Sequence, residues 1–164
     1  MDREQIAAVL QQTHLFRGAD PSDLECVAEI VDEVSAPPGQ HIFFQGDIAT
    51  EFFVLADGKV RIYIPGHGGE LDLGIVEDGQ MFGEGGLFDG GPRVASAIAL
   101  EPSTILRIPR DEWLLVVDEI PEFTRRMLFA TGASVRQYTS HAIDFLFLDV
   151  EIPSFPPAED APPG

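Results

Sequence analysis

The chain has 164 residues, 45% of them hydrophobic and 23% charged, which is the composition and size of one soluble domain with a buried core. Its 10 basic and 28 acidic side chains give a net charge of −18, which disfavours binding to nucleic acid or to anionic membranes, because both need a basic face. It has neither a signal-peptide pattern nor the roughly 20 apolar residues of a membrane span, so we expect a cytoplasmic protein.

Residues suited to covalent or metal chemistry are sparse. Cys26 is the only cysteine, and the apolar run from Leu24 to Val31 predicts that its thiol is buried. The four histidines are scattered, and no cysteine or histidine cluster has the spacing of a zinc or iron–sulfur site. No nucleophile–base pair or pair of catalytic carboxylates is recognisable. We therefore expect no metal, no cofactor and no catalytic activity.

Helices are expected at the N-terminus and strands in the middle of the chain. Apolar residues recur at helical spacing over 4–16 and again over 22–34, where Pro21 is a typical first helical residue. From Pro37 onward, turn signals recur every roughly 8–12 residues, a spacing typical of an all-β sandwich or barrel. Short strands with alternating apolar residues lie between the turns, most clearly over 59–64. The pattern predicts a jelly roll of antiparallel strands.

Helical spacing returns after residue 110. A short helix is expected over 111–119, and a proline at 121 separates it from a long helix over 122–147. An a/d pattern, typical of paired helices, runs along the long helix: Leu128, Thr131, Val135, Tyr138, Ala142 and Phe145. We divide the chain into a β domain with its short helices over 1–120, the long helix over 121–148, and an acidic, proline-rich tail over 149–164 that we expect to be disordered.

The glycine-rich run from Gly79 to Ala97, G-Q-M-F-G-E-G-G-L-F-D-G-G-P-R-V-A-S-A, carries the clearest chemistry. Arg93 is its only basic residue and can pair with a phosphate. Residues 85–88 can form one helical turn whose N–H groups point at the same phosphate, since glycine lets the backbone approach closely. Glu84 can accept a hydrogen bond from a sugar hydroxyl, and its charge can orient Arg93.

This run resembles the phosphate-binding cassette of cyclic-nucleotide-binding domains. Other segments agree with that family in order and spacing: L-F-R-G-A-D, P-P-G-Q-H-I-F-F-Q-G-D and F-F-V-L-A-D-G-K-V. The likeness covers residues 6–120 and implies a mainly β jelly roll with flanking helices that binds a cyclic mononucleotide. It assigns Glu84 to the ribose hydroxyl and Arg93 to the cyclic phosphate.

The resemblance also implies further ligand contacts. They are Gly83, Gly85, Gly86, Leu87, Val94, Ala95 and Ser96, with Ile75 and Met81 as apolar cover. Two positions depart from the family pattern. Gly85 replaces a bulky apolar residue, which suggests a looser turn, and Val94 stands where a threonine is linked with cGMP, which favours cAMP.

The end of the long helix, A-I-D-F-L-F-L-D-V, resembles the dimerisation helix of catabolite-activator-type transcription factors. That likeness implies a homodimer and places Tyr138, Thr139 and Ser140 near the purine, in the same chain or across the dimer. A helix-turn-helix domain follows in those proteins, whereas E-I-P-S-F-P-P follows here. We therefore expect a stand-alone sensor that relays its ligand state to an unknown effector protein through its C-terminal helices.

Other interpretations stay open. The chain could be a ligand-independent dimerisation or scaffold module on the same fold, or a sensor of a cyclic dinucleotide or another small anion. A DNA-binding regulator is disfavoured by the net charge of −18. The sequence leaves the choice between cAMP and cGMP open, and also whether the ligand activates or represses.

Overall fold

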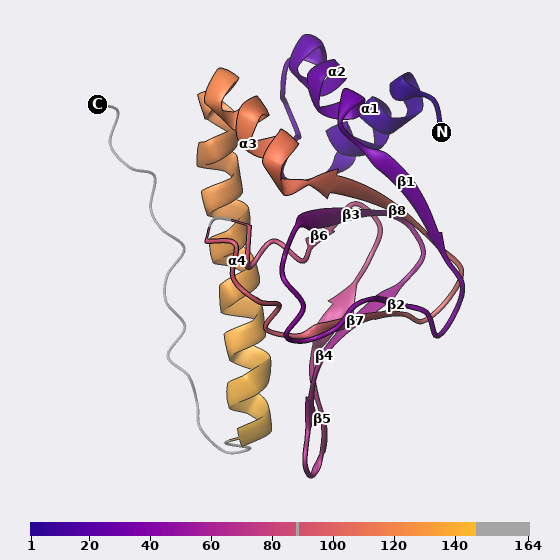
Figure 1. Ribbon diagram of the computed structural model, residues 1–164, viewed down its shortest axis with the longest axis vertical. Helices are drawn as coiled ribbons and strands as arrows, with labels where there is room; N and C mark the ends of the chain where they lie inside the picture. The colour runs from indigo at the N-terminus through magenta and orange to yellow at the C-terminus, as the bar shows by residue number, and fades with distance from the viewer. Residues whose placement is uncertain (88, 147–164) are drawn as a thin grey trace.

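The computed structural model describes residues 1–87 and 89–146, with the side chains of Tyr138 and residues 141–146 left out. Its centre is a roll of two antiparallel four-stranded sheets, in the orders β1-β8-β3-β6 and β2-β7-β4-β5 (Figure 1). The strands are β1 (Asp32–Ala36), β2 (His41–Phe43), β3 (Glu51–Asp57), β4 (Val60–Gly66), β5 (Gly69–Val76), β6 (Met81–Phe82), β7 (Ser96–Ala99) and β8 (Ser103–Pro109). The predicted jelly roll with flanking helices is confirmed.

The helices of the described residues are α1 (Arg3–Gln12), α2 (Pro21–Glu29), α3 (Arg110–Glu119) and α4 (Pro121–Leu146). In Figure 1, α1, α2 and α3 gather at one end of the roll, and α4 runs along its side. A core of aromatic rings joins these helices to β3: Trp113 lies edge-on to Phe16 and Phe52, with ring centroids 5.8 and 5.3 Å apart. We call this core and its neighbours, Leu87, Phe123 and Met127 among them, the helical cluster.

Both N-terminal helices are shorter than predicted. The first ends at Gln12, because the Thr13 hydroxyl donates to the Leu10 carbonyl at 2.7 Å and accepts from the Phe16 amide at 3.3 Å. Phe16 therefore reaches the core from a turn. The second ends at Glu29, because the β-branched residues that follow suit a strand, and residues 32–36 pair with β8.

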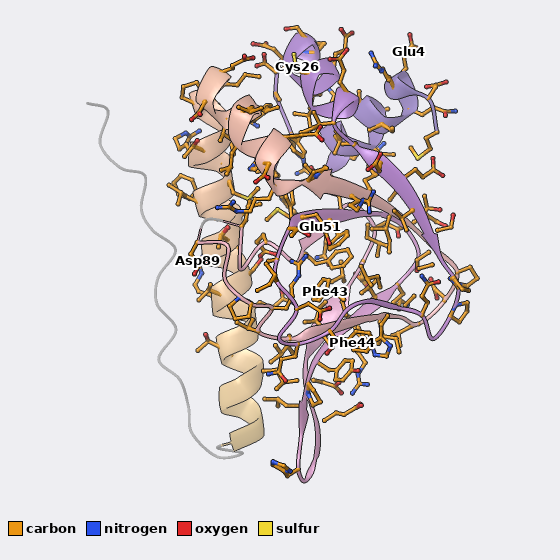
Figure 2. The ribbon with its side chains drawn as sticks, in the orientation of Figure 1. Glu4, Cys26, Phe43, Phe44, Glu51 and Asp89 are labelled. Carbon is orange, nitrogen blue, oxygen red and sulfur yellow. The ribbon has the colours of Figure 1, made fainter. Side chains whose placement is uncertain are left out.

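The prediction of a buried thiol at Cys26 is wrong. Helix α2 buries Leu24, Val27 and Ala28, which share one face at spacings of three and four residues. Cys26 is two residues from Leu24, so it lies on the other face and is exposed. Figure 2 shows it on the outer side of the helix.

The strand pairing of the roll shifts register at three places, and one of these bulges changes which residues of β5 face inward. The alanines of β7 point inward and are buried, together with Phe43, Phe53 and Phe82. The pairing of β4 with β5 shifts by one residue between Ile62 and Tyr63. Leu73 and Val76 consequently face the core, whereas Ile75 turns outward and is 40% exposed.

The long helix α4 is anchored at its start. Phe123 and Met127 are buried in the helical cluster, and the Arg126 guanidinium donates to the carbonyls of Arg17 and Gly18. Beyond this anchor the helix passes over β5, where Gly74 allows a close approach. A Cβ added at Gly74 would lie 3.2 Å from Nε2 of Gln137.

The predicted a/d pattern of α4 divides between two environments. Leu128 and Val135 are 60% and 57% exposed, whereas Thr131 faces the roll. Residue 147, where we expected the helix to end, and the tail over 149–164 lie outside the described residues. Over the described range, no helix combines the length and the apolarity needed to cross a membrane.

Candidate functional site

A cavity of about 270 Å³ lies between the roll and the middle of α4. Three segments far apart in the sequence meet there: the glycine-rich turn with its arginine, the inner faces of β2, β4 and β5, and α4. Its lining residues are Phe43, Ile62, Leu73, Gly83, Glu84, Gly85, Gly86, Arg93, Val94, Ala95, Thr131, Ser134 and Val135. Most of the residues predicted around Glu84 and Arg93 are therefore brought together at one place.

Arg93 lies in the wall of this cavity with its side chain only 3% exposed. One terminal nitrogen donates to the Gly83 carbonyl, and the other donates to the Glu51 carbonyl at 2.7 Å and lies 3.5 Å from the Glu51 carboxylate. The guanidinium also lies over the ring of Phe43, at 4.3 Å from its centroid, and over that of Phe53, at 5.5 Å. Figure 2 shows Phe43 and Glu51 within the roll, on β2 and β3.

One nitrogen of the Arg93 guanidinium has no hydrogen-bond partner. Its Nε atom is buried without a hydrogen bond to any of the described residues. Burial lowers the pKa of Arg93, and the charges of Glu51, Asp47 and Glu84 oppose this shift, but an arginine stays charged in proteins. An unpaired buried donor destabilises a fold by about 1–3 kcal/mol. Arg93 is therefore a buried cation in the wall of the cavity, and such a group is suited to an anionic ligand.

Glu84 is a buried carboxyl in the same cavity, with 3% of the residue exposed. Burial raises its pKa, while hydrogen bonding with the Ser134 side chain, its own backbone amide and the charge of Arg93 act in the opposite direction. The polar contacts of the Arg93 guanidinium are with Glu51 and Gly83, so Glu84 affects Arg93 only through its charge. The carboxyl oxygens of Glu84 are suited to accept a hydrogen bond from a ligand.

The turn after Glu84 has the tight backbone that its glycines predict. The Leu87 amide donates to the Glu84 carbonyl at 2.9 Å, and the Gly90 amide donates to the Gly86 carbonyl at 2.8 Å. Gly83 has a φ of +74°, and a Cβ there would lie 3.0 Å from Arg93, Phe43 and Phe53. A side chain at Gly83 would therefore displace the arginine.

A second backbone segment fixes Arg93 from the other side. The Arg93 amide donates to the Asp47 carbonyl at 2.7 Å, and the Arg93 carbonyl accepts from the Gly46 amide at 2.8 Å. The Ser96 hydroxyl accepts from the Gln45 amide at 2.9 Å and so holds this segment in place. Ser96 thus positions the wall of the cavity without lining it.

Other predicted contacts lie apart from this cavity. Leu87 is buried in the helical cluster. Ile75 and Met81 line a different cavity of about 150 Å³ between β5 and α4. Thr139 is exposed on α4, and the side chain of Tyr138 lies outside the described residues. Which of the predicted residues contact a ligand stays a prediction.

Sequence reasoning missed several residues of the site. Nothing in the sequence pointed to Glu51, because it is 42 residues from Arg93 along the chain. Only folding brings its backbone carbonyl and its carboxylate to the guanidinium. Ile62 and Leu73 were not assigned to the site, because alternation indicates only that they share a face with other apolar residues of their strands. Thr131 and Val135 were assigned to helix pairing, because their spacing indicates only that they share one face of the helix. It does not indicate that this face lies beside the roll. Among the described residues, no cluster of three or more metal-ligating side chains is found.

The family model for the cyclic nucleotide-binding domain matches residues 33–119, and the chain belongs to this family. It is 34% identical over 108 residues to a cyclic AMP receptor protein of Thermus thermophilus, covering 65% of this chain and 50% of that protein. It is 27% identical over 143 residues to a CRP-like cAMP-activated global transcriptional regulator of Mycobacterium tuberculosis, covering 87% and 64%. The chain thus spans about half to two thirds of the length of these relatives.

A solved structure agrees with this assignment. The crystal structure of the Thermus thermophilus catabolite activator protein matches this fold with a TM-score of 0.72 and 30% identity. The match covers 82% of this chain and 63% of that chain.

Two glycines of the turn provide a matched test of its backbone. Gly83→Ala should lower the free energy of unfolding by at least about 1–2 kcal/mol, because its positive φ disfavours a side chain and the added methyl meets Arg93. Gly85→Ala should change it by less than about 0.5 kcal/mol, since a Cβ there meets no described atom within 4 Å. Urea denaturation measures both, and equal losses would contradict this account of the turn.

The buried carboxyl should give a pH-dependent stability. Because the folded-state pKa of Glu84 is raised, ionising it lowers the free energy of unfolding at neutral pH. Below pH about 4 the side chain is protonated in both folded and unfolded states, so this cost disappears. Glu84→Gln should therefore stabilise the ligand-free protein at pH 7, with a difference that shrinks toward pH 4. Denaturation of both proteins across this range measures it, and a difference that grows on acidification would contradict it.

Proposed function

We propose that the protein is a sensor that binds a cyclic mononucleotide, with cAMP the preferred ligand and cGMP the alternative. The observation that carries this proposal is Arg93, a buried cation with an unpaired Nε in the wall of a cavity that also holds Glu84. A cyclic nucleotide offers a monoanionic phosphodiester to Arg93 and a free ribose hydroxyl to Glu84. The similarity to a cyclic AMP receptor protein and to a cAMP-activated regulator supports cAMP, as does Val94 at the cavity.

The size and lining of the cavity favour one nucleotide over two. A volume of about 270 Å³ lies just below the roughly 300–1,000 Å³ usual for small-molecule sites. The side chains of Phe43, Ile62, Leu73 and Val135 offer apolar surface for a purine. A cyclic dinucleotide would need a much larger site or a large displacement of α4.

Two contacts support a route from the nucleotide to the helices. The side chain of Leu87, in the turn after Glu84, packs in the helical cluster with Trp113 and Phe123. The backbone carbonyl of Leu87 accepts from Nε of Arg110, the first residue of α3. Ligand that orders the turn would act on α3 through both contacts. The break at Ile120, between α3 and α4, is then the hinge of a population shift.

The ligand state would be transmitted to a partner protein through the position of α4. Leu128 and Phe129 are apolar and exposed on this helix, as expected of a surface that pairs with a second copy of the chain. We propose a homodimer formed through this face, without catalytic activity of its own, whose helix position is read by a partner protein. A monomeric mass in sedimentation equilibrium at micromolar concentration would contradict the dimer.

Loss of the buried cation should abolish nucleotide binding. Arg93→Ala should weaken cAMP binding by about 2–5 kcal/mol, because the phosphate would be left unpaired in a buried site. Arg61→Ala is the matched control, since Arg61 pairs with Glu70 and Asp72 on β5, away from the cavity. Calorimetric titration with cAMP, cGMP and a cyclic dinucleotide measures the binding. If the folded wild type binds none of the three, the proposed nucleotide sensor is wrong, and the scaffold module or a sensor of another small anion takes its place.

The relay should be visible in amide exchange. With saturating cAMP, hydrogen–deuterium exchange should change over residues 110–146 as well as in the turn at 83–93, because Leu87 and Arg110 connect the two regions. Arg93→Ala should lose both changes together. Protection of the turn alone, with unchanged exchange over 120–146, would contradict the relay while leaving nucleotide binding intact.

A further inference from the structure

A groove between α1 and α2 lies apart from the nucleotide cavity and shares no lining residue with it. Its volume is about 360 Å³, larger than that of the nucleotide cavity. We call it the α1–α2 groove, because it is lined by residues of these two helices alone: Arg3, Glu4, Ala7, Ala8, Gln11, Pro21, Leu24, Glu25 and Glu29. No other element of the described chain therefore forms part of it.

The α1–α2 groove has the form of a seat for a third helix. The Arg3 guanidinium pairs with the Glu29 carboxylate at 2.7 Å, so the first residue of α1 lies beside the last residue of α2 and the helices run antiparallel. Ala7 and Ala8, in the middle of α1, have small side chains that leave space between the helices. From Arg3 to Gln11 the groove spans about 12 Å, or two helical turns. One face of a partner helix can pack between two such ridges.

The rim of the α1–α2 groove is acidic. Residues 1–33, which contain both helices, carry eight acidic and two basic side chains. Arg3, the basic residue of the lining, is already paired with Glu29. Glu4 on α1 and Glu25 on α2 make no ion pair with any described residue, and Figure 2 shows Glu4 pointing away from the roll. A partner with cations on both sides of an apolar stripe complements this rim, since opposite charges across an interface speed encounter and fix register.

The α1–α2 groove is connected to the start of α4. Leu24, in its floor, is buried in the same helical cluster as Leu87 of the turn after Glu84. The Arg126 guanidinium of α4 donates to the carbonyls of residues 17 and 18, in the segment that joins α1 to α2. A shift of α4 would therefore act on the segment that connects the two walls of the groove.

We propose that the α1–α2 groove is the docking surface for the effector protein, and that the effector presents a basic amphipathic helix to it. This helix would place apolar side chains on Ala7, Ala8 and Leu24, and lysine or arginine side chains beside Glu4 and Glu25. As the output of a nucleotide sensor the groove rests on the proposed function, whereas its complementarity to a basic helix needs no nucleotide.

A synthetic peptide tests the groove without the natural effector. The probe is a fluorescein-labelled peptide of about 18 residues, long enough to form a helix, with leucine and alanine on one face and lysine on the other. Fluorescence anisotropy with the full chain should show saturable binding. A peptide of the same composition with scattered apolar residues should bind at least about 10-fold more weakly. No binding, or equal binding of both peptides, overturns the inference.

A matched pair of charge variants locates the peptide. Glu4→Gln combined with Glu25→Gln should weaken binding by roughly 3- to 10-fold, because two ion pairs are lost. Asp118→Asn combined with Glu119→Gln removes the same charge from exposed positions of α3 and should change affinity by less than about twofold. Equal losses in the two double variants would mean attraction to the overall charge and would overturn the inference.

A second matched pair tests the space between the helices. Ala8→Phe fills the groove and should abolish saturable binding, whereas Cys26→Phe, on the outer face of α2, should bind like the wild type. Both positions are exposed, so both variants should melt near the wild-type temperature. Wild-type affinity in a folded Ala8→Phe variant contradicts docking in the groove.

The nucleotide separates this inference from the proposed function. Saturating cAMP should change the dissociation constant of the peptide by at least about fivefold, and Arg93→Ala should lose this effect while it still binds the peptide. If cAMP binds but leaves the affinity for the peptide unchanged, the groove is not the output and the inference is wrong. If the wild type binds no cyclic nucleotide, the proposed function fails, and the peptide variants still decide whether the groove is a docking surface.

Discussion

The burial of one guanidinium sets the conditions for the rest of this site. Removing the charge of Arg93 from water costs free energy. The Glu51 carboxylate, two backbone carbonyls and two aromatic faces offset this cost. These groups come from both sheets, since Phe43 lies on β2 and Glu51 on β3. The arginine therefore joins the two halves of the roll, and glycine is required at 83 because a Cβ there would meet Arg93 and two phenylalanine rings.

The turn beside Arg93 borders both the cavity and the helices. Gly83, Glu84, Gly85 and Gly86 line the cavity, whereas Leu87 is buried in the helical cluster together with Trp113 and Phe123. The Leu87 carbonyl also accepts a hydrogen bond from Nε of Arg110. In the proposed relay, the close packing of this cluster would transmit a displacement of the turn to α3. The start of α4 is anchored in that same cluster, whereas its middle borders two cavities.

Local patterns predicted most of the fold, and the misses have physical causes. Alternation located the strands, and Ile120-Pro121 located the break before α4. The length of α2 was wrong because pairing of residues 32–36 with β8, a tertiary interaction, decided the conformation after Glu29. Ile75 faces outward because a bulge in the pairing of β4 with β5 reverses the alternation there, and such a bulge leaves no mark in the sequence. The cassette residues could be predicted from one continuous motif, whereas Glu51 and Thr131 join the site only through long-range folding.

Affinity and selectivity have separate sources in this arrangement. The cyclic phosphate and the ribose hydroxyl are common to all cyclic purine mononucleotides, so Arg93 and Glu84 alone would bind them with similar strength. Discrimination needs a polar group at the base, because apolar walls distinguish bases weakly, whereas a hydrogen bond rejects a ligand that leaves the protein group unpaired. In the proposed complex the helix α4 lines the cavity through Thr131, Ser134 and Val135, so the bound ligand also contacts the helix. A ligand with the wrong base would then fill the pocket yet hold the helix less firmly, and ligand identity would be coupled to output.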